Sequence, residues 1–169
     1  MWILTILLSI LVAVFQTTVL PSLKIYGGGF DLILVLTLIF LYYGSLRKAG
    51  VFLLISSIVA SIISGVAIIY ILVPDFFVIV IWTILLSKRI ISYPSAIFSI
   101  PIFFSASIIA NLMELLIRNG FAFFFLPPLI SSSLQNTTIG VILYYLSYKI
   151  FLFLNPQVKR ERIIISNFK

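Results

Sequence analysis

Apolar residues run along this chain in long unbroken stretches, separated by short segments that contain proline, glycine or basic residues. The stretches do not alternate between apolar and polar at every second position, so they predict helices rather than strands. We expect helices over residues 2–20, 30–45, 51–72, 75–87, 93–117 and 129–154. Pro74 should end the third of these, which leaves the fourth short, and Pro101 should kink the fifth.

Composition explains why the stretches are so long. Of 169 residues, 63% are hydrophobic and 9% are charged, whereas a soluble domain carries about a quarter charged residues. The apolar side chains must therefore face lipid, and at about 20 residues per crossing the chain holds roughly six spans. The sequence predicts an all-α membrane protein, a bundle of about six transmembrane helices. Residues 1–155 form this single domain, its first helix retained rather than removed as a signal peptide, and residues 156–169 form a basic cytoplasmic tail.

Basic residues predict the orientation, because cytoplasmic loops of membrane proteins carry more lysine and arginine than outer loops. With both termini in the cytoplasm, the inner loops and tail carry Arg47, Lys48, Lys88, Arg89, Lys149, Lys159, Arg160, Arg162 and Lys169. The outer loops carry only Lys24 and Arg118. The net charge of +7 is therefore interpreted as setting orientation and contacting anionic membrane lipids, not nucleic acid.

The residue types available for chemistry are few. Cysteine and histidine are absent, which removes the usual thiol nucleophile, the commonest general base and the commonest metal ligands. No phosphate-binding loop, dinucleotide fingerprint or nucleophilic-serine motif is present. We expect no metal, no cofactor and no enzymatic activity. A membrane enzyme would have to use Asp31 and Glu114 as its catalytic pair, and this is the least favoured alternative.

Polar residues within or near the predicted spans all fall toward the outer side of the membrane. They are Gln16, Thr17, Asp31, Asn111, Glu114, Gln135 and Asn136. Because polar groups in hydrocarbon are costly unless they pair or meet water, we expect them to converge on a pocket that opens outward. Glu114 can share a helix face with Arg118 and Asn111, either as a local ion pair or as a contact to a partner or ligand.

Small residues in the third helix recur at intervals of four. Ser57, Ser61 and Gly65 predict a face on which another helix packs closely. The packing helix is either internal or the transmembrane helix of a partner.

Several of these residues also resemble the MreD family of bacterial rod shape-determining membrane proteins. The order Gln16-Thr17-Thr18-Val19-Leu20-Pro21, a short loop and then Phe30-Asp31-Leu32 is similar to the start of that family. Gly44 and Gly50 around the basic pair match its turn into the third span, and Pro127, Pro128, Gln135 and Asn136 match its entry to the last span. The chain departs from the pattern at Phe30, where the family has proline, and in lacking an aspartate before Gly65.

This resemblance implies a non-enzymatic scaffold of the wall-elongation machinery in the bacterial inner membrane. Such a scaffold binds an MreC-like protein and, through it, MreB and the wall synthases of the RodA and penicillin-binding type. It also implies a fold similar to the six-helix substrate-binding subunits of vitamin transporters. Such a subunit of an energy-coupling factor transporter is the alternative function, although its usual Ala-xxx-Ala face on the first span is represented here by Ala13 alone.

Overall fold

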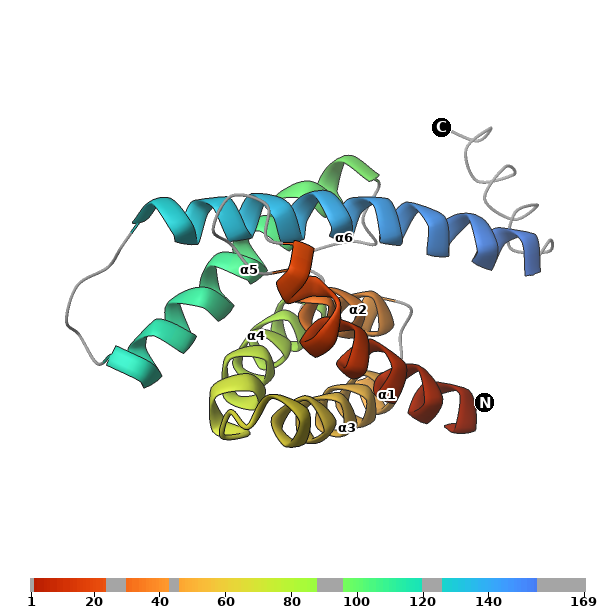
Figure 1. Ribbon diagram of the computed structural model, residues 1–169. Coiled ribbons are helices and arrows are strands. Elements are labelled where there is room, and N and C mark those ends of the chain that lie inside the picture. Colours follow the sequence, from red (N-terminus) through yellow and green to blue (C-terminus); the bar gives the residue numbers. More distant parts are fainter. Residues whose placement is uncertain (1, 24–29, 43–45, 88–95, 120–125, 155–169) are drawn as a thin grey trace.

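The structure is a computed structural model that describes residues 2–23, 30–42, 46–87, 96–119 and 126–154 (Figure 1). The elements are α1 (Trp2–Thr18), the short 3-10 helix η1 (Leu20–Leu23), α2 (Leu32–Tyr42), α3 (Leu46–Ser64), α4 (Ile69–Ser87), α5 (Ala96–Asn119) and α6 (Leu126–Leu154). These ranges contain six α-helices and no strand, which confirms the all-helical prediction. The predicted basic tail, 156–169, lies outside the described residues.

Two described segments are long and apolar enough to cross a bilayer, Leu46–Ser64 and Ser99–Arg118. The apolar stretches Trp2–Thr18, Leu32–Tyr42 and Ile69–Leu85 are shorter. Length and composition therefore point to a membrane protein without fixing the number of crossings.

Helix α2 occupies the middle of the described fold and contacts α1, α3, α4 and α6. Eight of its eleven residues are buried, as expected for a helix that is apolar on every side. The Phe40 ring packs at 5.2 Å from that of Phe52 on α3, and the Tyr42 ring meets Tyr144 of α6 edge-on at 6.2 Å. Helix α2 is therefore the buried element against which α1, α3, α4 and α6 pack.

Helix α1 packs against α3 through small side chains. Thr5, Ser9 and Ala13 lie at intervals of four and are buried, and α3 turns Ser57 and Ala60 inward. The Ser9 hydroxyl donates to the Thr5 carbonyl at 2.7 Å, so its polar atom is satisfied within its own helix. Small residues let two backbones approach closely, which is the main source of helix association in lipid.

The boundary between α3 and α4 lies at Gly65, not at Pro74 as the sequence pattern predicted. Gly65 has a φ of +69°, and its N–H donates to the Ser61 carbonyl at 3.0 Å. The Ser61 hydroxyl donates to the carbonyl of Val66 at 2.7 Å. A left-handed glycine with these bonds is a common way for a helix to end. Pro74 lies inside α4, in its second turn, where it has no N–H to donate to the carbonyl four residues earlier.

The shifted boundary alters three of the sequence-based expectations. Helix α4 has 19 residues, about 28 Å at 1.5 Å per residue, rather than the short stretch 75–87. Gly65 lies beyond α3, so the predicted Ser57–Ser61–Gly65 packing face stops short of it: Ser57 is fully buried, whereas Ser61 is only half-buried. Arg47 and Lys48 open α3 instead of closing the preceding helix.

Helices α5 and α6 pack against each other (Figure 1), and Gly140 of α6 lies against Phe103 of α5. A Cβ atom built on Gly140 would lie 2.7 Å from Cδ1 and Cγ of the Phe103 ring. Phe103 is itself only 1% exposed, so the ring has little room to withdraw. Glycine is therefore required at this crossing.

We expect Gly140→Ala to lower the free energy of unfolding by about 1–3 kcal/mol, the usual cost of overpacking a dense core. Gly50→Ala is the matched control. Gly50 lies within α3, and a Cβ atom added there would meet no atom within 4 Å, so alanine should leave stability unchanged or raise it by up to about 1 kcal/mol. Unfolding of both variants in detergent micelles measures the difference. Equal effects at the two positions would contradict the packing at Gly140.

Candidate functional site

A hydrogen-bonded polar network joins α1, the start of α2 and α6. The Gln16 side-chain amide donates to Asp31 Oδ1 at 3.3 Å, and Gln16 Oε1 accepts from the backbone N–H of Ile33 at 2.9 Å. The Asp31 backbone N–H donates to Asn136 Oδ1 at 2.7 Å. Three residues that are far apart in the sequence therefore form one chain of hydrogen bonds.

The network continues between α5 and α6. The Asn136 amide donates to the Ser107 hydroxyl at 2.8 Å, and both residues are buried. One helical turn further along α5, the Asn111 amide donates to the hydroxyls of Ser132 and Ser133 at 2.8 and 3.1 Å. These serines were not singled out from the sequence, because serine is common in this chain and only the spatial partner distinguishes them.

Asp31 also caps α2. Its Oδ1 accepts from the Leu34 N–H at 3.0 Å, the arrangement typical of an N-terminal capping aspartate. The first N–H groups of a helix have no helical partners. At the start of α2, side chains accept two of them: Gln16 accepts from Ile33, and Asp31 accepts from Leu34. Asp31 therefore both defines where α2 begins and ties that point to α1 and α6.

Glu114 and Arg118 form an ion pair at 2.8 Å, with side chains that are about half-exposed. The Arg118 guanidinium also lies over the Tyr70 ring of α4, 5.3 Å from its centroid. Such a half-exposed pair stabilises the fold only slightly, by about 0–1 kcal/mol. Because both side chains are about half-exposed, the ion pair lies at the rim of the polar cluster and is accessible to another molecule.

Asp75 is the residue that the sequence interpretation missed. It is 2% exposed, and its Oδ2 has no hydrogen-bond partner among the described residues. The sequence pattern predicts a helix that begins at Asp75, after Pro74, and so puts this residue at a helix end. Inside α4 it is an acidic residue surrounded by apolar ones, which is the sequence signal of a functional position in a membrane helix.

The other two predicted pocket residues, Thr17 and Gln135, each follow or precede a network residue on the same helix. Thr17 donates its hydroxyl to the Ala13 carbonyl at 2.8 Å, a bond within its own helix. Gln135 lies half-buried beside Asn136 on α6. The structure therefore brings Gln16, Asp31, Asn111 and Asn136 into two neighbouring sets of bonds, with Glu114 at the rim.

The chemistry of this cluster is that of a clamp between helices. Its amides and hydroxyls bond mainly to one another and to helix starts. Among the described residues no group of three acidic, histidine or cysteine side chains is placed to hold a metal ion. Comparisons with known proteins add no assignment: no family model, no curated protein and no solved structure matches the chain.

Replacing Asn136 by leucine should lower the free energy of unfolding by about 1–3 kcal/mol for each partner left without a hydrogen bond. The partners are the Asp31 N–H and the Ser107 hydroxyl. Thr138→Leu is the control, because exposed Thr138 bonds to the Leu134 carbonyl of its own helix. Thermal unfolding in detergent compares the two variants. Loss of stability no greater than in the control would show that the network does not clamp the helices.

Asp75→Asn should raise the free energy of unfolding by about 1 kcal/mol or more, since it removes a buried, unpaired acidic group. Glu114→Gln provides the comparison, because that carboxylate is half-exposed and already paired with Arg118; it should change stability by less than about 1 kcal/mol. The same unfolding assay measures both. A marked loss of stability in Asp75→Asn would reveal that Asp75 has a partner that holds it in the fold.

Proposed function

We propose that this chain is a multi-pass protein of the bacterial inner membrane with six spans and both termini in the cytoplasm. The exposure of large apolar side chains supports a membrane location. Every described α-helix except the buried α2 carries such side chains on its surface. Ile3, Leu4 and Ile62 are 74%, 71% and 76% exposed, for example. Soluble proteins rarely leave such continuous apolar surface in water, whereas lipid is a favourable neighbour for it.

The arrangement of the helix ends supports the alternating topology. The Gln16–Asp31–Asn136 bonds join the end of α1 to the start of α2 and to the first half of α6. Arg118, near the end of α5, lies over Tyr70 at the start of α4. Helices that alternate in direction bring these ends to one side. The distribution of basic residues in the sequence favours the outer side for them.

Within that setting we propose a scaffold of the wall-elongation machinery, similar to the MreD family, that binds an MreC-like protein. One observation carries the proposal: Gln16, Asp31 and Asn136, which carry much of the resemblance in sequence, are joined by hydrogen bonds. A scaffold needs rigidly positioned helices rather than reactive groups, and a clamp between α1, α2 and α6 supplies that rigidity. MreB and the wall synthases would be reached indirectly, and no catalytic role is proposed.

Glu114 and Arg118 are the proposed contact to the partner. Both are about half-exposed and lie at the rim of the polar cluster. A partner that carries complementary charges can pair with either group while the helices stay in place.

The alternative, a vitamin-binding subunit of an energy-coupling factor transporter, would retain the six-helix fold but dock a coupling protein through small residues on its first span. In this chain the small residues of α1, Thr5, Ser9 and Ala13, are buried against α3. The exposed face of α1 carries large side chains instead, such as Leu7 and Leu11. This arrangement favours the scaffold.

Affinity purification of the tagged full-length chain from its own membranes should recover an MreC-like protein. Glu114→Arg should reduce that recovery by about tenfold, corresponding to about 1.4 kcal/mol of lost pairing, while Lys149→Gln, a charge change in the second half of α6, should not. Identification of the captured proteins by mass spectrometry decides the question. Recovery of a coupling protein, or a vitamin that co-purifies, would replace the scaffold by the transport alternative.

Topology can be tested directly because the chain has no cysteine of its own. Single cysteines introduced as Arg47→Cys and Lys159→Cys should react with a membrane-impermeant reagent only after the cells are opened. Ala67→Cys, in the exposed turn between α3 and α4, should react in intact cells. Labelling of the Arg47 and Ala67 positions from the same side would contradict the crossing of α3.

A further inference from the structure

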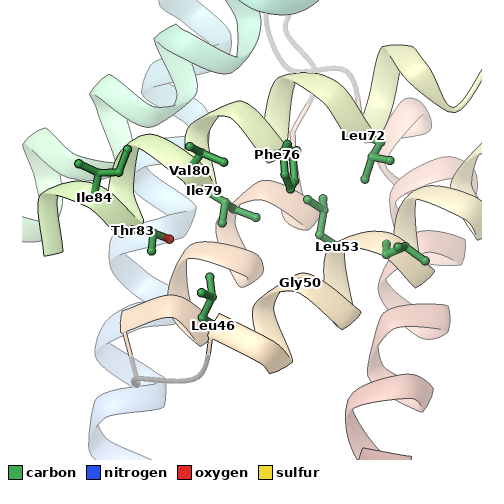
Figure 2. A pocket seen from close by; sticks show the side chains of 10 residues that line it. Leu46, Gly50, Leu53, Leu72, Phe76, Ile79, Val80, Thr83 and Ile84 are labelled. Atoms are coloured by element: carbon green, nitrogen blue, oxygen red, sulfur yellow. The ribbon is translucent and has the colours of Figure 1, made fainter. Parts of the chain in front are cut away.

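An apolar groove of about 590 Å³ runs between α3 and α4, away from the polar network. Figure 2 shows its two walls, with Leu46 and Thr83 at one end and Leu72 at the other. Its lining includes Leu46, Gly50 and Leu53 of α3 and Phe76, Ile79 and Thr83 of α4. Apart from the Thr83 hydroxyl, the lining side chains are apolar.

The dimensions of the groove fit a single hydrocarbon chain. Along α4 it extends from Leu72 to Ile84, about 18 Å at 1.5 Å per residue. Gly50 leaves its α3 wall open, since even a Cβ added there would meet no atom within 4 Å. A volume of about 590 Å³ over that length is too small for a third helix, which measures about 10–12 Å across with its side chains.

Charge and polarity are concentrated at the Leu46 end. Arg47, the next residue of α3, is exposed, and the first turn of α3 has no acidic residue. Thr83 faces the same end (Figure 2), and its hydroxyl oxygen is buried without a hydrogen-bond partner among the described residues. The groove is thus an apolar channel with an unused hydroxyl at one end, and an exposed arginine follows the lining residue Leu46 in the first turn of α3. This arrangement complements an anionic amphiphile.

We propose that the α3–α4 groove binds one acyl chain of an anionic phospholipid of the inner leaflet, with the phosphate group beside Arg47. The leaflet follows from the membrane orientation under Proposed function, on which this part of the inference rests. The hydrocarbon chain replaces the contacts that the open groove lacks, and Arg47 selects the headgroup. The lipid would then fill the space between α3 and α4 and stabilise their packing.

The test uses the purified full-length protein in a neutral detergent. Thermal unfolding is recorded with added phosphatidylglycerol, with phosphatidylcholine of the same acyl chains, and with inorganic phosphate alone. Phosphatidylglycerol should bind more tightly than phosphatidylcholine, and phosphate alone should have no effect. Arg47→Gln should weaken phosphatidylglycerol binding about fivefold, the usual effect of one basic residue at a membrane surface, and leave phosphatidylcholine binding unchanged.

Gly50→Phe should abolish binding of both lipids, because the ring fills the channel. Val80→Phe closes the channel from the α4 wall and serves if Gly50→Phe does not fold. Lys149→Gln is the charge control and should bind as the unmodified chain does. Equal binding of the two phospholipids, stabilisation by phosphate alone, or unchanged lipid binding in the folded plugging variant would each overturn the proposal.

These outcomes are separable from the proposed function. The detergent assay measures lipid binding whether or not an MreC-like partner is recovered from membranes. Labelling of Arg47→Cys from outside the cell would contradict both the proposed orientation and the assignment of the lipid to the inner leaflet. Lipid binding in the groove would still be tested by Gly50→Phe and Val80→Phe.

Discussion

The hydrogen bond from the Asp31 N–H to Asn136 Oδ1, at 2.7 Å, joins positions 105 residues apart and holds the centre of this fold together. The buried helix α2 begins immediately after Asp31. A helix start has N–H groups with no helical partner, and among apolar neighbours each one must find another acceptor. Gln16 and Asp31 itself supply two acceptors and Asn136 supplies a third. Because α1, α2 and α6 all contribute, none of them can shift alone without leaving a polar group unpaired.

Packing around this clamp combines a buried apolar core, centred on α2, with close contacts at small residues and one glycine. In lipid, apolar area gains little by leaving its surroundings, so close contact and hydrogen bonds determine which helices associate. The buried faces of α1 and α3, and the Gly140–Phe103 crossing of α5 and α6, are of this kind. Many of the large aliphatic residues are placed outward. The outward placement of these large aliphatic residues agrees with the proposed membrane setting.

Much of the helical pattern follows from the sequence, because long apolar stretches with few interruptions allow little else. Helix boundaries were less predictable. Proline is a stronger local breaker than glycine, yet α4 continues through Pro74 and Gly65 ends α3 instead, by adopting a left-handed backbone. The choice depends on the Ser61 bonds around the turn, which only the folded chain reveals. The sequence pattern wrongly predicts a helix boundary at Pro74, which puts Asp75 at a helix end instead of inside α4. For this reason the sequence does not include Asp75 in the candidate site.

The polar residues were recognisable individually, since an amide or carboxylate in an apolar stretch is conspicuous. Their partners were not, because Ser107, Ser132 and Ser133 are ordinary serines until Asn136 and Asn111 are placed against them. Asp75 differs from all of these in having an oxygen with no hydrogen bond in the described structure. Its apolar surroundings follow from the end of α3 at Gly65 rather than at Pro74, because that boundary places Asp75 inside α4.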